Sequence, residues 1–248
     1  MNIFEHIGRY FLMLKVVFSL PDNKKVFWER FFDEAYLIII KSIPLVLFLS
    51  FFMGGVVTIQ TAANMESPLL PKYTIGFITR QSTILEFSPT IITLIIAGKV
   101  GSNIASEIGT MRVTEQIDAL DIMGVNSINY LMLPKILATT LFYPFVIIIS
   151  MVVSIFGGWF AGVASGLYST ETYVLGLHYA WDMVEVGIPY ALTKSMVFAF
   201  LFTSIASYFG YYTKGGALEV GKASTSAVVT TAIAILLANY MLTQLILI

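Results

Sequence analysis

The sequence contains no cysteine and only two histidines, His6 and His178, among its 248 residues. The absence of cysteine excludes disulfides, thiol nucleophiles and cysteine-ligated metals. Charged residues make up 12% of the chain, about half of the roughly 25% that a soluble domain carries. The 14 basic and 15 acidic residues nearly cancel, so the net charge of −1 gives no electrostatic argument for binding nucleic acid. These scarcities nearly exclude a soluble enzyme.

Hydrophobic residues, by contrast, make up 57% of the chain, and the mean hydropathy is +0.84. A membrane-spanning helix needs about 20 largely apolar residues, and five segments approach or exceed that length. We therefore predict an all-α integral membrane protein in which residues 1–248 form a single transmembrane domain. The five predicted spans are residues 36–62, 83–106, 130–168, 186–212 and 223–247.

The uncharged run 136–170 is too long for one straight span, so one long helix and a tight hairpin are both open. Lysine and arginine near the ends of spans mark the cytoplasmic side. A single crossing puts most basic residues on one side, whereas a hairpin would move Lys214 and Lys222 to the opposite side. We therefore predict a single crossing, with the N-terminus inside and the C-terminus outside. The basic residues left on the outer half are then Lys72, Arg80 and Lys194.

Two amphipathic segments precede the first span. Apolar residues recur with helical spacing over residues 3–18, Pro21 breaks the pattern, and a second piece follows with the sequence KKVFWERFFDEA. We predict that residues 1–34 form elbow helices that lie on the inner leaflet. A cleaved signal sequence is less favoured, because no apolar core of adequate length precedes a small-residue cleavage site.

The segment between the second and third spans concentrates charge in a chain that otherwise lacks it. Gly124 is a plausible helix stop, and a short amphipathic helix over residues 110–124 is predicted on the cytoplasmic side. The position of this segment between two spans would by itself favour a solvated connecting loop over a helix that binds a partner. The apolar stripe of the predicted helix consists of Val113, Ile117, Leu120 and Met123.

Longer motifs in this region resemble a known family. The stretch AGKVGSNIASEIGTMRVTEQIDALDIMGV resembles the core motif of the MlaE (YrbE) family of ABC-transporter permeases, which serve Mla and MCE lipid-transport systems. EQIDAL at 115–120 is similar to the family's coupling-helix hexapeptide, although Gln116 stands where the family often has a second acidic residue. The likeness extends to EFSP at 86–89, to LTKSMVFAF in the fourth span and to KGGALEVGKAST at 214–225.

The resemblance implies a permease subunit that moves phospholipid, or a similar lipid, between the inner membrane and an outer-face MCE-domain lipid-binding protein. It also implies a homodimer that sits on a cytoplasmic ABC ATPase and has its C-terminus in the periplasm. The residues that the resemblance assigns to the ATPase contact are Arg112, Glu115, Asp118, Leu120 and Gly124.

A nucleotide site within the chain itself is not expected. Residues 216–222 supply G-x-x-x-x-G-K, but Ala223 follows where a P-loop needs a hydroxyl for magnesium, and no strand precedes the glycine. We predict that nucleotide hydrolysis comes from another subunit. We also predict no catalytic residue, cofactor or metal in this chain, because no nucleophile–base or metal-ligand pattern is present.

Four ionisable residues fall within or beside the second and fourth spans. Charged groups in a span are costly, so Glu86 and Lys194 are candidates either for a structural ion pair or for contact with a lipid headgroup. The alternative function is an ion-coupled secondary transporter that uses the same two residues. Lys99 and Glu107, near the inner interface, are predicted to snorkel or to pair structurally.

Small residues are frequent in the spans. Gly54 and Gly55 follow Phe51 in the first span, where they either open a groove for acyl chains or simply pack against another helix. Two ladders of small residues at four-residue spacing favour packing within one subunit over contact with a second subunit. They are Ala97, Gly101, Ala105 and Gly109 in the second span and Ser150, Ser154, Gly158, Gly162 and Gly166 in the third.

Overall fold

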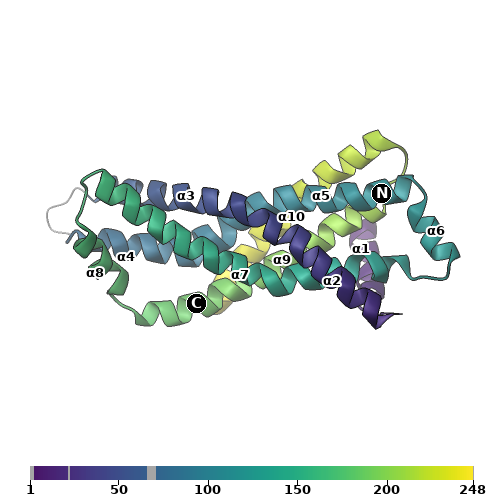
Figure 1. Ribbon diagram of the computed structural model, residues 1–248, viewed down its shortest axis with the longest axis horizontal. Coiled ribbons are helices and arrows are strands. Elements are labelled where there is room, and N and C mark those ends of the chain that lie inside the picture. Colours follow the sequence, from purple (N-terminus) through teal and green to yellow (C-terminus); the bar gives the residue numbers. More distant parts are fainter. Residues whose placement is uncertain (1–2, 22, 66–70, 248) are drawn as a thin grey trace.

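The computed structural model describes residues 3–21, 23–65 and 71–247 as an elongated bundle of helices (Figure 1). Five helical runs in this part of the chain are long and apolar enough to cross a membrane, which confirms the predicted all-α class with five spans. The long uncharged stretch forms one helix rather than a hairpin. The five runs are Lys24–Asn64, Tyr73–Val113, Ser127–Ala164, Asp182–Tyr211 and Ala217–Ile246.

The N-terminal part contains two helices ahead of the apolar part of the first run. The Asn23 side chain caps the second of them by accepting hydrogen bonds from the backbone N–H groups of Lys25 and Val26. The first helix packs on the fourth run, where Tyr10 and Ser204 hydroxyls lie 2.7 Å apart. The elements are α1 (Ile3–Val17), α2 (Lys24–Ile38), η1 (Ile40–Ser42) and α3 (Ile43–Asn64).

The second run is longer than the predicted 83–106, and its middle section is a π-helix. Hydropathy missed the first ten residues because they include Arg80, whose guanidinium is buried and donates to the carbonyls of Leu177 and Ala180. Pro89 lies inside the π-helix and cannot donate a backbone hydrogen bond. The elements of this run are α4 (Tyr73–Ser82), η2 (Thr83–Ile92) and α5 (Thr93–Val113).

The remaining helices complete the bundle. In Figure 1, α1 and α6 lie at one end of the bundle and α8 lies at the other end. Side chains of Asn126 and Ser169 cap the helices that follow them, so both starts are specified locally. The elements are α6 (Gln116–Ile122), α7 (Ser127–Ala164), α8 (Thr170–His178), α9 (Asp182–Tyr211) and α10 (Ala217–Leu247).

Small residues bring α3 and α7 into backbone contact. A Cβ on Gly54 would collide with the carbonyl of Ser154, and one on Gly157 would collide with the carbonyl of Phe51. The Ser150 hydroxyl lies 2.9 Å from that of Ser50, so polar side chains also join the two helices. The third-span ladder therefore packs within this chain.

The ladder on α5 also faces helices of the same chain. A Cβ on Gly109 would lie 3.2 Å from Val220 on α10, and one on Gly101 would lie 3.8 Å from Ala206 on α9. Both ladders thus follow the predicted packing within one subunit. The outer face of α10 remains apolar and exposed, as Leu237 and Met241 illustrate.

Candidate functional site

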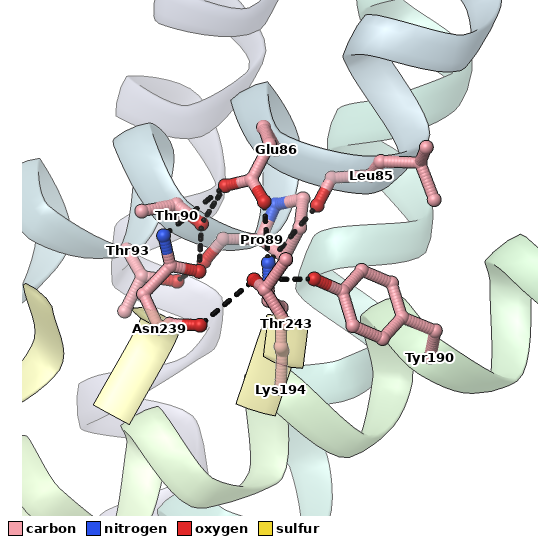
Figure 2. Close-up of polar contacts among 9 residues, drawn as sticks. All are labelled: Leu85, Glu86, Pro89, Thr90, Thr93, Tyr190, Lys194, Asn239 and Thr243. Carbon is pink, nitrogen blue, oxygen red and sulfur yellow. Dashed lines mark hydrogen bonds and ion pairs between the residues drawn. The ribbon is translucent and has the colours of Figure 1, made fainter. Parts of the chain in front are cut away.

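The structure brings Glu86 and Lys194 together at a polar cluster between η2, α9 and α10 (Figure 2). The Lys194 ammonium lies 2.7 Å from Oε1 of Glu86 and donates to the carbonyl of Leu85 at 3.3 Å. The Lys194 side chain is fully buried, whereas 43% of the Glu86 side chain is exposed. The two residues therefore form an ion pair in which the lysine is buried and the carboxylate is partly exposed.

The carboxylate of Glu86 has two further partners, one on α10 and one on η2 itself. The Asn239 amide nitrogen lies 3.3 Å from Oε2 of Glu86, and the Thr90 hydroxyl lies 3.0 Å from the same oxygen (Figure 2). The Lys194 ammonium also sits 4.4 Å above the centre of the Tyr190 ring, a cation–π distance. The Tyr190 hydroxyl lies 2.8 Å from that of Thr243, so α9 and α10 are joined beside the ion pair.

The π-helix η2 positions Glu86 within this cluster. π-Helical turns are rare and are frequent at functional sites, because they redirect side chains relative to a regular α-helix. The missing N–H of Pro89 removes one α-helical hydrogen bond from this stretch, which favours the wider turn. Sequence reasoning found Glu86 from its cost in a membrane, but it did not predict the π-helix.

The other predicted lipid-cavity residues lie elsewhere, on α3. Gly54 and Gly55 are buried against α7, so their local environment is helix packing. The Phe51 ring is half-buried and packs against Phe156 and Phe160 of α7, 6.2 and 5.7 Å between ring centres. The structure does not bring these three residues to the Glu86–Lys194 pair.

The predicted cytoplasmic helix forms a sharp corner with α5. Glu115 separates α5 from α6 and has a positive φ of 61°, a conformation that is uncommon for a residue with a side chain. Arg112 closes the corner by a salt bridge of 2.7 Å to Asp118. Gly124 ends the helix with φ 79°, and Val125 donates its N–H to the carbonyl of Leu120, as in a Schellman motif. The predicted stop at Gly124 is confirmed.

The apolar stripe of this corner is buried at one end and exposed at the other. Ile117 is fully buried and Leu120 is half-buried, whereas Ile122 and Met123 are exposed. Leu120 and Met123 also line a cavity of about 350 Å³ shared with α2 and α7. The five residues assigned to the ATPase contact therefore lie on α6 or directly beside its two ends, and the C-terminal end of this helix is apolar and exposed.

A second buried lysine forms a charge cluster that sequence reasoning missed. The Lys135 ammonium on α7 lies 2.6 Å from Glu34 of α2 and 2.9 Å from Glu107 of α5. The exposed fractions of the three side chains are 3%, 11% and 54%, respectively. Glu107 was expected to snorkel or to pair structurally, but its partner was not identified. Lys135 follows Pro134 at the start of an apolar run and thus looked like an ordinary flanking lysine.

Comparisons with known proteins agree on the type of protein. A family model described as Permease MlaE matches residues 31–245. A probable ABC transporter permease protein of Rickettsia bellii is 33% identical over 241 residues, which cover 97% of this chain and 92% of the relative. A probable ABC transporter permease protein of Synechocystis sp. is 36% identical over 206 residues, 83% of this chain and 77% of the relative.

A plant protein is also similar. The chloroplastic protein Trigalactosyldiacylglycerol 1 of Arabidopsis thaliana is 31% identical over 230 residues, which cover 89% of this chain and 62% of the relative. Similarity thus spans most of the five-helix bundle in bacterial and chloroplast proteins alike. This chain belongs to the MlaE family of ABC transporter permeases.

Proposed function

We propose that this protein is the permease subunit of an ABC transporter that moves phospholipid, or a similar lipid. The partners are a cytoplasmic ATPase subunit, a second copy of this chain and an outer-face MCE-domain protein that receives or delivers the lipid. The complex resides in the inner membrane, with the N-terminus of this chain in the cytoplasm and the C-terminus in the periplasm. The family match and the name of the plant relative, which refers to a lipid, support this proposal.

One structural observation supports a mechanism that couples the ATPase to the Glu86 cluster. A single helical run, Tyr73–Val113, connects the Glu86 cluster to the corner at Glu115. A helix transmits displacement along its axis, so movement of α6 by an ATPase would shift η2 relative to α9 and α10. The polar contacts of Glu86 with Lys194 and Asn239 would then change with each ATPase cycle.

The Glu86–Lys194 pair is our candidate for the headgroup contact. The exposed part of Glu86 can accept a hydrogen bond from a headgroup amine, and Lys194 can attract a phosphate when η2 moves away. We do not assign the pair to ion-coupled transport. The Lys194 ammonium already occupies the position beside Glu86 that a transported cation would need.

The coupling role of α6 is tested by charge reversal. Glu115→Lys and Asp118→Arg should each lower the recovery of the ATPase subunit by more than about tenfold, the effect of losing a central interface contact. Membrane insertion should be unchanged. Glu219→Lys is the matched control, because that carboxylate belongs to α10 and its side chain is also substantially exposed, at 42%. Unchanged ATPase recovery from both variants would show that α6 does not form the contact with the ATPase.

The headgroup role of Lys194 is tested by lipid recovery. Lys194→Ala should lower the amount of phospholipid that co-purifies with the complex, measured by mass spectrometry. Lys214→Ala, at an exposed position on the turn before α10, is the control. Equal lipid in Lys194→Ala and the unmodified protein would leave the pair with a structural role only.

A further inference from the structure

A cavity of about 630 Å³ lies near the α6 end of the bundle, between α5, α7 and the junction of α2 with α3. It is separate from the Glu86 cluster and contains several charged groups. Lys99, Asn103 and Glu107 line it from α5, where four-residue spacing places them on one face. We call it the inner cavity, and its charged and amide side chains are Glu34, Lys41, Lys99, Asn103, Glu107 and Lys135.

The charges of the inner cavity are unevenly distributed. Lys135 faces two carboxylates, so this group carries a formal charge of −1 when all three side chains are ionised. Both oxygens of Glu107 lie 2.9 Å from the Lys135 ammonium, but a carboxylate can accept about four hydrogen bonds and more than half of this side chain is exposed. Glu107 therefore retains capacity for a second cationic donor.

The opposite charge lies deeper along α5. Lys99 precedes Glu107 by eight residues, a rise of about 12 Å at 1.5 Å per residue. Its ammonium donates to the carbonyl of Lys41 at 3.1 Å and has donors left for another acceptor. Val100 and Ile104 add apolar lining between these polar groups.

This order of groups matches one kind of lipid. If the α6 end is cytoplasmic, as the proposed function requires, a path from the cytoplasm toward the membrane centre passes Glu107 first and then Lys99. A phospholipid of the inner leaflet with an amine headgroup presents its ammonium nearest the cytoplasm, its phosphate deeper and its acyl chains deepest. The lining as a whole, with three lysines and two carboxylates, carries a formal charge of +1, so the match depends on where the charges lie. A headgroup without an amine would place no cation beside Glu107, where the Lys135 group is negative.

We propose that the inner cavity binds the headgroup of an inner-leaflet phospholipid that carries a primary amine, of the phosphoethanolamine type. The Glu107 carboxylate accepts hydrogen bonds from the ammonium, and Lys99 and Lys41 donate to the phosphate. This inference rests on the proposed function and deepens it, because it names a lipid class and an access site on α5. Glu107 lies six residues before the end of α5 at Val113, so the bound lipid touches the helix that leads into α6.

The test is photo-crosslinking of the complete transporter complex in nanodiscs. Phosphatidylethanolamine and phosphatidylglycerol, each with a diazirine at the start of one acyl chain, are compared at equal mole fraction, and labelled peptides are mapped by mass spectrometry. We expect the ethanolamine lipid to label peptides within 34–44 and 96–107 about fivefold more than the glycerol lipid, as one partly exposed charge-assisted contact would give.

Three variants probe the cavity from different sides. Glu107→Gln should reduce the ethanolamine preference about fivefold, because it removes the charge that faces the ammonium. Lys99→Gln should instead reduce labelling by both lipids about fivefold and leave the preference unchanged, because both lipids carry the phosphate. Asn103→Trp should abolish labelling by both lipids, since it fills the cavity without changing a charge. Glu219→Gln is the control for Glu107→Gln, because both carboxylates lie near this end of the bundle and are about half exposed.

The outcomes separate this site from the proposed function. Equal labelling by the two lipids, a preference unchanged in Glu107→Gln, or undiminished labelling of Lys99→Gln would overturn the inference even if the ATPase still co-purifies. Soluble phosphoethanolamine should compete only in large excess over the lipid, because the acyl chains hold the lipid in the membrane beside the cavity. Full protection at the concentration of the lipid would overturn the inference by identifying a soluble ligand in place of a lipid. Labelling as expected from a complex that does not transport lipid would contradict the proposed function alone.

Discussion

Two buried lysines, Lys194 and Lys135, are held in opposite ways. The exposed fractions of their side chains are 0% and 3%, so neither ammonium is hydrated by bulk water. Lys194 has one carboxylate partner in the described part of the chain, Glu86, and 43% of that side chain is exposed. Lys135 has two partners, and only 11% of the Glu34 side chain is exposed.

The number and exposure of the carboxylate partners decide which residue of each cluster would be left as an uncompensated buried charge if its partner were removed. An isolated charge is costly to bury, and removing one member of a buried pair leaves that cost uncompensated. Among the described residues Lys194 has Glu86 as its one carboxylate, beside the neutral Leu85 carbonyl and Tyr190 ring. Glu86, by contrast, retains Thr90, Asn239 and solvent. At the other cluster the dependence is reversed, because Lys135 has a second carboxylate, whereas Glu34 forms no other salt bridge within the described part of the chain. The Glu86–Lys194 arrangement suits a site whose ion pair opens and closes. The Lys135 arrangement suits a fixed contact between helices.

Removal of Lys135 should have the largest effect. Lys135→Met leaves the nearly buried Glu34 carboxylate without its cation and should lower the free energy of unfolding by about 3–5 kcal/mol. Thermal unfolding of the purified protein in detergent measures this loss. Lys25→Met, at an exposed position on α2, should change stability little. Adding Glu34→Leu to Lys135→Met should restore part of the loss, and a purely additive double variant would contradict the assigned pairing.

The Glu86–Lys194 pair should show an asymmetry of intermediate size. Glu86→Leu leaves a fully buried ammonium and should cost about 2–4 kcal/mol of unfolding free energy, whereas Lys194→Met leaves a carboxylate that water reaches and should cost only about 1–2 kcal/mol. Parallel thermal unfolding of the two variants provides the comparison. If Lys194→Met were the more damaging change, the view that the lysine is the dependent member would fail.

Replacement of the exposed carboxylate at the Lys135 cluster should matter least for stability. Glu107→Gln leaves Glu34 to balance Lys135, so the unfolding free energy should fall by no more than about 1 kcal/mol, as for other exposed ion pairs. The same unfolding assay measures it. A loss as large as that of Lys135→Met would show that the two carboxylates share the lysine more equally than their exposure indicates.

The sequence located one of these clusters and missed the other for a physical reason. Glu86 and Lys194 stand out because each interrupts an otherwise apolar span, where a charge is costly. Lys135 and Glu34 lie at the ends of apolar runs, where charged residues are ordinary. Nothing in the local pattern showed that packing of α2 on α7 would bury both of them.

The corner between α5 and α6 was partly predictable. Glycine is common where a helix ends in the left-handed conformation, so Gly124 was recognisable as a stop. Glu115 adopts the same conformation without being glycine, and its sequence context suggested helix instead. The predicted helix over 110–124 is therefore two helices in the structure, because α5 continues to Val113 and α6 begins at Gln116.

The sequence by itself determined the all-α class, the five crossings and the family, because the length and hydropathy of an apolar run are local properties and the longest motif is continuous. Only the tertiary structure decided which charges meet. Lys135 and Glu34 are 101 residues apart, and Lys194 and Glu86 are 108 residues apart, so their contacts exist only once the helices pack. The inner cavity arises in the same way, from three parts of the chain that have no local pattern in common.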